Sequence, residues 1–370
     1  MKVALVHDWL TGMRGGEKVL EALCLLFPQG DIFTLIHTRG SVSPTIESRR
    51  ITTSFVQHLP RAATHYRQYL PLFPTAIEQL DLDGYDLVIS SSHCVAKSAV
   101  VPGRARHLSY CFSPMRYAWD QFDEYFGPAR VGPLASRLIY RPLLARLARW
   151  DAATASRAHR FVAISQHVAG RIRRYYDREA TVVYPPVDTA FYQPAPTVPG
   201  QQFLVVSALV PYKRIDRAIS GCAQAGVPLR IIGSGPDRPR LERIAGPSVE
   251  FLGPVPDDVV RAEYQAARGV ILAGEEDFGI VPLEAQACGR PVVALRQGGA
   301  LETVRDGETG VFFDDPTPES LASAIARLHS VSLDPHHARA NAERFSVERH
   351  IEGLRAAIDE TLARPVGTRW

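Results

Sequence analysis

The chain has 370 residues, 46% of them hydrophobic, and a mean hydropathy of −0.07. This composition is typical of a soluble globular protein, and the length favours two domains over one. No window approaches ~20 uninterrupted apolar residues, so we expect no membrane-spanning helix. The first ten residues lack a small-residue cleavage site, so we expect no signal peptide.

The formal net charge of +3 hides an uneven distribution. Residues 1–185 carry 23 Lys and Arg against 15 Asp and Glu, a net of +8, whereas residues 186–370 carry 19 against 24, a net of −5. A basic half can be attracted to an anionic surface or substrate, although an incidental excess on solvated helices would look the same.

The five cysteines are scattered and form no C-x-x-C pair. A disulfide framework or a zinc site is therefore not expected, and a cytoplasmic location follows as the default. The positions are Cys24, Cys94, Cys111, Cys222 and Cys288.

Short apolar runs alternate with longer amphipathic ones along the whole chain. Strands of four to eight residues separated by helices predict parallel sheets with βαβ crossovers, and their lack of polar alternation indicates that both faces are covered. In the first half we expect strands at 2–8, 31–36, 85–92, 107–112, 160–166 and 181–188, with a helix at 15–28. In the second half we expect strands at 203–209, 229–236, 249–255, 269–275, 291–295 and 310–313, with helices from about 215 and 282.

Residues 184–202 contain five prolines and no apolar periodicity, and so predict a linker. The fold class predicted is therefore α/β, with two doubly wound, Rossmann-like domains facing each other across a cleft. We place the first domain at 1–188 and the second at 189–349. Ligands of such sheets bind beyond the carboxyl ends of the strands.

The segment EEDFGIVPLEAQACG, residues 275–289, follows a predicted strand and opens a helix. The backbone amides of Gly279, Ile280 and Val281 would point out of the positive end of that helix, which suits a phosphate. Glu276 and Glu284 on either side would accept hydrogen bonds from sugar hydroxyls. This pattern fits a sugar nucleotide, although a helix start with acidic residues that favour its dipole is an equally ordinary explanation.

The same segment resembles the E-x7-E signature, with an internal Phe278–Gly279, of retaining glycosyltransferase family 4. Residues 207–219, 231–237, 251–258 and 298–316 resemble that family's C-terminal half. Residues 15–23, 90–99 and 110–126 resemble its bacterial O-antigen and exopolysaccharide mannosyltransferases. The resemblance implies the GT-B fold, with a terminal helix at about 350–370 crossing back to the first domain.

The resemblance also implies roles for single residues. Lys213 and Arg214 would bind the donor diphosphate as its charge grows. Ala208 stands where the wider family commonly has an arginine, so either Arg214 supplies the second charge or phosphate binding is weaker. Gly233 and Phe278 would also belong to the donor site.

Three residues in the first half could also contact the donor. Gly15 and Gly16 open the first helix without the G-x-G-x-x-G spacing of a dinucleotide fingerprint, and could approach a sugar or phosphate, or simply form a loop. His93 ends a strand, and the resemblance implies that it contacts the donor sugar. With Glu276 it is a candidate catalytic residue.

The acceptor would lie nearby. Asp8 ends the first strand, and residues 113–126 mix aromatic side chains with polar ones, including Arg116, Tyr117 and Asp120. Sugars stack on aromatic faces and bond to carboxylates, so an acceptor site is one interpretation, and an ordinary aromatic core is the other.

Residues 134–150, LASRLIYRPLLARLARW, form the most basic amphipathic segment. Such a segment could lie on an anionic leaflet or pack on the sheet as an ordinary surface helix.

The residue pattern predicts a sugar-nucleotide site, and the resemblance implies a retaining hexosyltransferase that moves mannose from GDP-mannose to a saccharide acceptor on a lipid carrier, in bacterial surface polysaccharide synthesis. We expect no cofactor, no metal and no nucleic-acid partner, and a cytoplasmic protein with peripheral contact to the inner face of the plasma membrane. A Rossmann-type oxidoreductase is disfavoured by the missing glycine fingerprint. A sugar-nucleotide epimerase and a non-catalytic sugar-nucleotide binder remain as alternatives.

Overall fold

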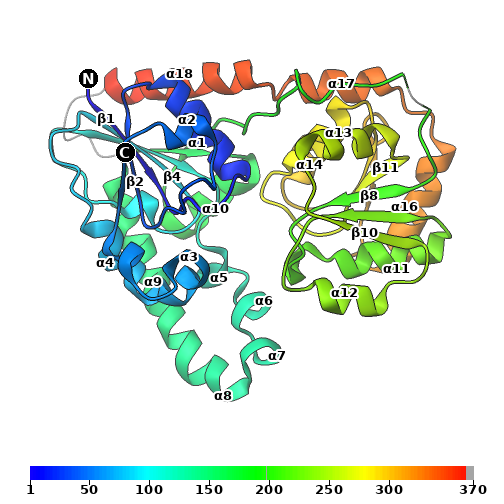
Figure 1. Cartoon of the computed structure of the whole chain (residues 1–370), viewed down its shortest axis with the longest axis horizontal. Coiled ribbons are helices and arrows are strands. Elements are labelled where there is room, and N and C mark those ends of the chain that lie inside the picture. The colour runs from blue at the N-terminus through cyan, green and yellow to red at the C-terminus, as the bar shows by residue number, and fades with distance from the viewer. Residues whose placement is uncertain (197, 364–370) are drawn as a thin grey trace. The chain divides into compact units, whose positions relative to one another are not determined.

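The computed structural model describes residues 1–196 and 198–363 and divides the chain into two units (Figure 1). The first unit comprises Met1–Pro185 together with residues 350–363, and the second comprises Pro186–Arg349. The chain thus leaves the first unit inside the proline-rich segment, at residue 185 where 188 was expected.

The first unit contains a seven-stranded sheet in the order β3-β2-β1-β4-β5-β6-β7, with every pair of neighbouring strands parallel. Every residue of the central strands β1, β4 and β5 is buried, which explains why these strands show no polar alternation. The strands are β1 (Val3–His7), β2 (Asp31–Thr34), β3 (Ile51–Thr53), β4 (Leu87–Ser92), β5 (Arg106–Cys111), β6 (Arg160–Ala163) and β7 (Ala180–Val182).

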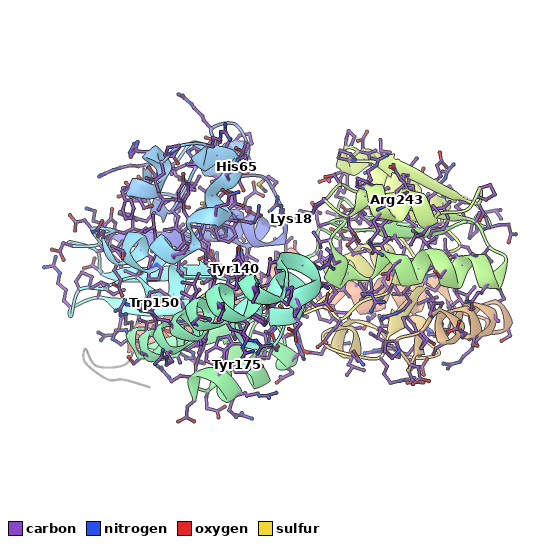
Figure 2. The ribbon with its side chains drawn as sticks, turned by 90° about the horizontal axis from the view of Figure 1, so that it is seen from below. Lys18, His65, Tyr140, Trp150, Tyr175 and Arg243 are labelled. Carbon is purple, nitrogen blue, oxygen red and sulfur yellow. The ribbon has the colours of Figure 1, made fainter. Side chains whose placement is uncertain are left out.

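Helices connect these strands and cover the sheet. Figure 2 shows α9 from below, with Trp150 on it and Tyr140 immediately before its first residue. The helices are α1 (Gly15–Leu26), α2 (Pro44–Glu47), α3 (Ala62–His65), α4 (Phe73–Glu78), α5 (Arg116–Trp119), α6 (Phe122–Phe126), α7 (Pro128–Val131), α8 (Pro133–Ala135), α9 (Arg141–Thr154) and α10 (Gln166–Tyr176). Shorter turns are η1 (Phe55–His58), η2 (Tyr66–Leu72), η3 (Ala96–Ser98), the π-helical η4 (Ser136–Tyr140) and η5 (Ala155–Arg157).

The second unit contains a six-stranded parallel sheet in the order β10-β9-β8-β11-β12-β13. Its strands are β8 (Phe203–Val206), β9 (Leu229–Ile232), β10 (Val249–Gly253), β11 (Gly269–Leu272), β12 (Val292–Leu295) and β13 (Gly310–Phe313). Its helices are η6 (Pro211–Lys213), α11 (Ile215–Ala225), α12 (Arg238–Ile244), α13 (Asp257–Ala266), α14 (Ile280–Ala287), α15 (Ala300–Thr303), α16 (Pro318–Ser330) and α17 (Pro335–Glu343).

The predicted fold class is confirmed, because each unit is a Rossmann-like parallel sheet with helical crossovers. The cleft expected between the units stays a prediction. The edge strand β3 was not expected, and its three half-buried residues are too few to show a pattern.

The last helix, α18 (Val347–Ala363), corresponds to the helix expected at about 350–370, of which residues 364–370 lie outside the described residues. Within the first unit, His350 Nδ1 lies 2.7 Å from the carbonyl oxygen of Tyr184, to which it donates. Gly353 allows this approach, since a Cβ there would lie 2.9 Å from Val183 Cγ1. Burial lowers the pKa of His350 to about 4, so the ring is neutral at pH 7.

In each sheet the order of the strands reverses next to the first strand. The reversal lies between β1 and β4 in the first unit and between β8 and β11 in the second. Open α/β sheets bind ligands at this switch point, beyond the carboxyl ends of the strands. A functional site is therefore expected among the residues that follow these four strands.

Candidate functional site

The loop that follows β11 leads directly into α14. Gly279 is the N-cap residue of this helix and has a φ of +97°, a conformation that residues with a side chain rarely adopt. The helix begins at Ile280, and Pro282 lies in its first turn, where backbone N–H groups have no intrahelical partner. The amides of Gly279, Ile280 and Val281 thus lie at the positive end of a helix, which attracts anions.

An ion pair crosses the switch point of the second unit. Lys213 ends the turn η6 after β8, and its Nζ donates to the carboxylate of Glu276 in the loop after β11. The Lys213 and Glu276 side chains are 18% and 14% exposed, so the pair is partly shielded from water but can still be reached. A cation and an anion are therefore placed together beside the N-terminus of α14.

Three glycines allow the backbone segments around this pair to approach closely. A Cβ at Gly274 would lie 2.8 Å from the carbonyl oxygen of Tyr212, and one at Gly298 would lie 2.3 Å from that of Glu276. A Cβ at Gly299 would lie 2.3 Å from the Cα of Phe278, and the Gly299 N–H donates to the Glu276 carbonyl over 2.8 Å. These glycines fix the position of Glu276, and the sequence pattern did not single them out.

Glu284 lies in the second turn of α14 and is only 7% exposed. Its Oε2 accepts a hydrogen bond of 2.9 Å from the hydroxyl of Tyr264 on α13. Burial, and then the nearby Glu284 carboxylate, raises the pKa of Tyr264 well above its usual value. Glu284 therefore accepts a hydroxyl donor, as expected, but here the hydroxyl belongs to the chain itself. Its contact with a ribose stays a prediction.

Arg214 follows Lys213 and is the N-cap residue of α11, with a φ of +52°. Its guanidinium binds Asp216 through two hydrogen bonds of 3.1 and 3.2 Å. Burial would raise the pKa of Asp216, but the hydrogen bond from Arg214 outweighs it and holds that pKa below its usual value. Asp216 thus balances much of the Arg214 charge. Less of that charge is left to replace the arginine that is absent at Ala208.

Gly233 and Phe278 each have a structural role in addition to the donor-site role predicted for them. Gly233 has a φ of +130°, and a Cβ there would lie 1.9 Å from the carbonyl oxygen of Ser207. The carboxyl ends of β8 and β9 can therefore meet only with glycine at this position. Phe278 is 3% exposed, and its ring lies 5.7 Å from that of Phe345. Any ligand contact by Phe278 would therefore come from its backbone.

At the switch point of the first unit, Asp8 follows β1 and is completely buried. Its Oδ2 accepts from the amides of His93 and Cys94 at 2.7 and 2.9 Å, and its Oδ1 accepts from those of Val95 and Ala96, both at 2.7 Å. The carboxylate thus holds together the turn that follows β4. This corrects the expectation that Asp8 contacts an acceptor, because four backbone donors already surround its oxygens.

His93 is half-buried, with 38% of its side chain accessible. Its Nδ1 lies 3.2 Å from Asp8 Oδ2, and its ring meets Trp9 edge-on, with 4.5 Å between the ring centroids. Burial lowers the pKa of His93, while Asp8 acts in the opposite direction. Since a carboxylate can only accept, Nδ1 carries the proton in the neutral ring, and Nε2 is left as an acceptor.

A second carboxylate–histidine pair lies beside it, and the sequence pattern did not reveal it. His7 Nδ1 lies 2.7 Å from Ser91 Oγ, and His7 Nε2 lies 3.8 Å from Glu17 Oε1 in the first turn of α1. Burial would raise the pKa of Glu17, but His7 outweighs it and the pKa is lowered. Gly15 and Gly16 begin α1 here, and a Cβ at Gly16 would lie only 3.5 Å from the His7 ring.

The aromatic segment around α5 is largely structural. The Tyr117 hydroxyl lies 2.9 Å from Cys94 Sγ, and burial raises the pKa of Tyr117 well above its usual value. Asp120 accepts a hydrogen bond of 2.7 Å from Arg171, and Arg116 is half-buried. The core interpretation thus holds for Tyr117. Acceptor contacts by Arg116 and Asp120 stay predictions.

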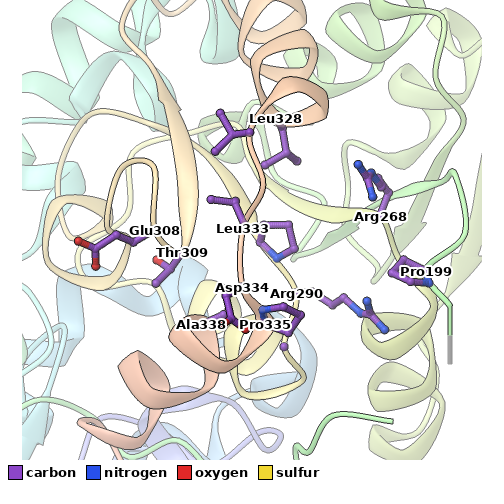
Figure 3. A pocket seen from close by; sticks show the side chains of 13 residues that line it. Pro199, Arg268, Arg290, Glu308, Thr309, Leu328, Leu333, Asp334, Pro335 and Ala338 are labelled. Atoms are coloured by element: carbon purple, nitrogen blue, oxygen red, sulfur yellow. The ribbon is translucent and has the colours of Figure 1, made fainter. Parts of the chain in front are cut away.

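A cavity of about 100 Å³ lies elsewhere in the second unit (Figure 3). Arg268, Arg290 and Thr309, on the segments that lead into β11, β12 and β13, are among the residues that line it. It is therefore at the amino ends of the strands, opposite the edge where such sheets bind their ligands.

Residues 1–196 and 198–363 show neither a cluster of metal ligands nor a membrane-spanning helix. No group of three or more His, Cys, Asp or Glu side chains in these ranges could hold a metal ion. Within the same ranges no helix combines the length and the apolar character needed to cross a bilayer.

Part of the chain matches a known protein family. Residues 192–345 match the family described as "Glycosyl transferases group 1". A D-inositol 3-phosphate glycosyltransferase of Acidothermus cellulolyticus is 34% identical over 215 residues, which cover 49% of this chain and 48% of that protein. The chain therefore aligns with about half the length of this curated relative.

Solved structures resemble the chain over nearly its whole length. The Anabaena protein Alr3699/HepE in complex with UDP has a TM-score of 0.72 at 18% identity, covering 97% of this chain and all of that one. The lipopolysaccharide outer core galactosyltransferase WaaB has a TM-score of 0.69 at 17% identity, covering 97% and 99%. The chain has the GT-B fold of these structures, and residues 192–345 of it match the group 1 glycosyl transferase family.

Proposed function

We propose that this protein is a glycosyltransferase that takes a hexose from a nucleoside diphosphate sugar and transfers it to a saccharide hydroxyl. The observation that carries the proposal is the Lys213–Glu276 ion pair at the β8/β11 switch point, beside the N-terminus of α14. The family match over residues 192–345 includes every one of these positions.

The ion pair suggests how the donor enters. A diphosphate brings its own negative charge, so it can take Lys213 from Glu276 while the amides of residues 279–281 and the helix dipole bind its oxygens. Glu276 is then released to accept from hydroxyls of the donor sugar, which carboxylates do well. Arg214 and the backbone at Gly233 complete the phosphate side, and Glu284 exchanges the Tyr264 hydroxyl for one of the ribose.

In the reaction the bond between the anomeric carbon and the leaving phosphate oxygen breaks, and a bond from that carbon to the acceptor oxygen forms. The departing diphosphate gains negative charge, which Lys213 and the positive helix end stabilise. We propose retention of configuration, with the acceptor proton passing to the leaving phosphate. His93, at the β1/β4 switch point with Gly15 and Gly16, is assigned to the donor sugar.

The finer assignment is mannose from GDP-mannose and a lipid-linked saccharide acceptor of surface polysaccharide synthesis, by a cytoplasmic enzyme at the inner face of the plasma membrane. The resemblance of residues 110–126 supports it. The relatives' names point to other substrates, since one is called an inositol 3-phosphate glycosyltransferase and one solved structure contains UDP. The donor base and sugar are therefore the first quantities to measure.

The test is a donor panel in two steps. Thermal shift with GDP, UDP, GDP-mannose and UDP-glucose identifies the bound nucleotide, because a ligand of the native state raises the melting temperature. Nucleotide release is then followed with and without a bacterial lipid extract. Release that depends on the extract is expected. An epimerised sugar without release would indicate an epimerase, and binding without either reaction would indicate a non-catalytic binder.

Lys213→Met supplies the matched control for this panel. It removes the charge but keeps the apolar stem, so the thermal shift by the nucleoside diphosphate should fall sharply while that by the free nucleoside stays unchanged. An unchanged shift by the diphosphate would remove Lys213 from the donor site.

A further inference from the structure

The segment of residues 128–150, here called the arm, is organised differently from the rest of the first unit. It comprises α7, α8, η4 and the first part of α9, and Figure 1 shows α7 and α8 at the end of this unit farthest from its sheet. The π-helical turn η4 has a local cause. Pro142 has no N–H to donate to the carbonyl of Leu138, and the Arg141 N–H bonds instead to the carbonyl of Ser136.

The inner side of the arm is well packed. Phe126 and Tyr140 stack with 4.8 Å between their ring centroids, and the guanidinium of Arg141 lies 4.8 Å from the ring of Phe122. Leu144 and Leu147, further along α9, are buried in the core of the first unit. The arm is therefore held in a defined conformation by one of its sides.

The outer side of the arm exposes three large aliphatic side chains within six residues. Leu134, Leu138 and Ile139 are 74%, 66% and 60% exposed. Other large apolar side chains that are exposed in the described part of the chain, such as Leu25 and Leu301, occur singly, which is normal on a protein surface. A concentrated group of this kind marks an interaction surface.

The charge of the arm identifies what it would contact. Residues 128–150 contain five arginines and no aspartate or glutamate. Only Arg141 has a nearby carboxylate, that of Asp123 at 3.7 Å, and both of these side chains are mostly exposed. Within residues 1–196 and 198–363, the other four arginines of the arm take part in no ion pair. The five are Arg130, Arg137, Arg141, Arg146 and Arg149.

We propose that the arm binds the surface of an anionic lipid bilayer. Leu134, Leu138 and Ile139 would insert at the level of the headgroups, and the arginines around them would bind lipid phosphates. A second copy of the chain is disfavoured as the occupant, because a two-fold contact through this surface would place five positive charges against five more. An anionic leaflet matches both the aliphatic group and the charge.

The arm also continues directly into the segment predicted to bind the acceptor. The ring of Phe126, at the base of the arm, lies 6.4 Å from that of Tyr117 on α5. If the proposed function holds, a bilayer bound to the arm would bring a lipid-linked acceptor to that segment. The lipid contact itself requires neither donor nor acceptor, so it can be tested separately.

The experiment is cosedimentation of the full chain with vesicles in the absence of any sugar nucleotide. One set of vesicles is phosphatidylcholine, and the other contains about 30% phosphatidylglycerol as the anionic lipid. Strong binding to the anionic set, weakened by salt, is expected. Arg137→Glu with Arg146→Glu should lower the partition coefficient at least about 30-fold, since each lost cation accounts for roughly fivefold. Leu134→Ser, Leu138→Ser and Ile139→Ser together should lower it about tenfold or more.

The matched control is Arg243→Glu with Ile244→Ser on α12, an exposed basic and apolar pair in the second unit (Figure 2). It should leave binding unchanged, and all variants should keep the wild-type melting temperature and nucleotide response because the altered side chains are exposed. Equal binding to both vesicle sets, or binding insensitive to the arm variants, would overturn the proposal. The proposal would also be overturned if the protein bound no vesicles and formed a dimer that the triple serine variant converted to a monomer. That result would identify a second copy of the chain as the occupant.

Discussion

Each switch point has a carboxylate at the carboxyl edge of its sheet, Asp8 after β1 and Glu276 after β11, and the surroundings of the two carboxylates differ. In the first unit Asp8 is completely buried, and four backbone amides donate to its oxygens. In the second unit Glu276 is 14% exposed and is paired with the side chain of Lys213. A carboxylate surrounded by backbone donors fixes a turn, whereas one paired with a flexible side chain can change partners when an anion arrives. Asp8 is therefore a positioning group, and Glu276 is free of such a structural role, which agrees with the binding role proposed for it.

The largest effect should come from Asp8→Ala. Removing the carboxylate leaves four backbone donors without their acceptor in a closed site, so the free energy of unfolding should fall by about 3–5 kcal/mol. Urea unfolding followed by circular dichroism measures the loss, with the exposed Asp83→Ala as the control. A loss below about 1 kcal/mol would contradict the positioning role.

Glu276→Ala, in contrast, should lower activity strongly and stability only slightly. Nucleotide release in the presence of acceptor should fall by about 10²–10³-fold, because a preorganised polar group at the reacting sugar is lost. The free energy of unfolding should change by no more than about 1 kcal/mol, as for other accessible ion pairs. Glu275→Ala, at the neighbouring position, is the control. Turnover within threefold of the wild-type value, roughly 0.7 kcal/mol, would remove Glu276 from the reaction.

The units should also differ in their response to acid. Burial lowers the pKa of His107 in the first unit to about 3 and that of His350 to about 4, whereas His329, His336 and His337 of the second unit are exposed. A histidine whose pKa is depressed by folding contributes its full stability above the unfolded value of about 6.5, and loses it as pH falls toward the folded value.

For His107 this loss amounts to about 2 kcal/mol between pH 6.5 and 5. Hydrogen exchange at pH 5 and 7, resolved by peptide, should therefore show the first unit losing protection while the second changes less. Equal losses in both units would contradict the assignment.

The smallest effect should come from Arg214→Ala. Because Asp216 balances much of its charge through two hydrogen bonds, the dissociation constant of the nucleoside diphosphate should rise only about five- to tenfold, or roughly 1 kcal/mol. Thermal shift or calorimetry measures this against Lys213→Met. An effect as large as that of Lys213→Met would show that Arg214 does supply the charge that is missing at Ala208.

Much of the candidate site in the second unit could be predicted from local pattern. Glu276, Gly279 and Glu284 lie in one continuous segment, where a strand, a glycine and a helix start follow in order. The partners of these residues could not be predicted in this way. Tyr264 comes from α13 and Gly298 from the loop after β12, and nothing in the spacing of either residue indicates the contact.

The first unit was harder to interpret for the same reason. Asp8 and His93 both end strands, so their place at the edge of a sheet could be expected, but the pattern suggested that Asp8 was open to a ligand. The pairing of β1 with β4 brings the amides of residues 93–96 onto that carboxylate and closes it. His7 on β1 and Glu17 on α1 meet only through the packing of that helix on the sheet, so the local sequence could not predict the pair.

Apart from the edge strand β3, the sequence by itself determined the alternation of strands with helices, the two Rossmann-like sheets and the helix start after β11. These depend on hydrophobic periodicity, on glycine and proline, and on contacts between residues close along the chain. The tertiary structure alone decided which carboxylate is buried among backbone donors and which is paired with a side chain, and that Leu134, Leu138 and Ile139 remain on the surface. Burial and pairing depend on side chains from distant segments, and a local pattern contains no information about which of those segments will meet.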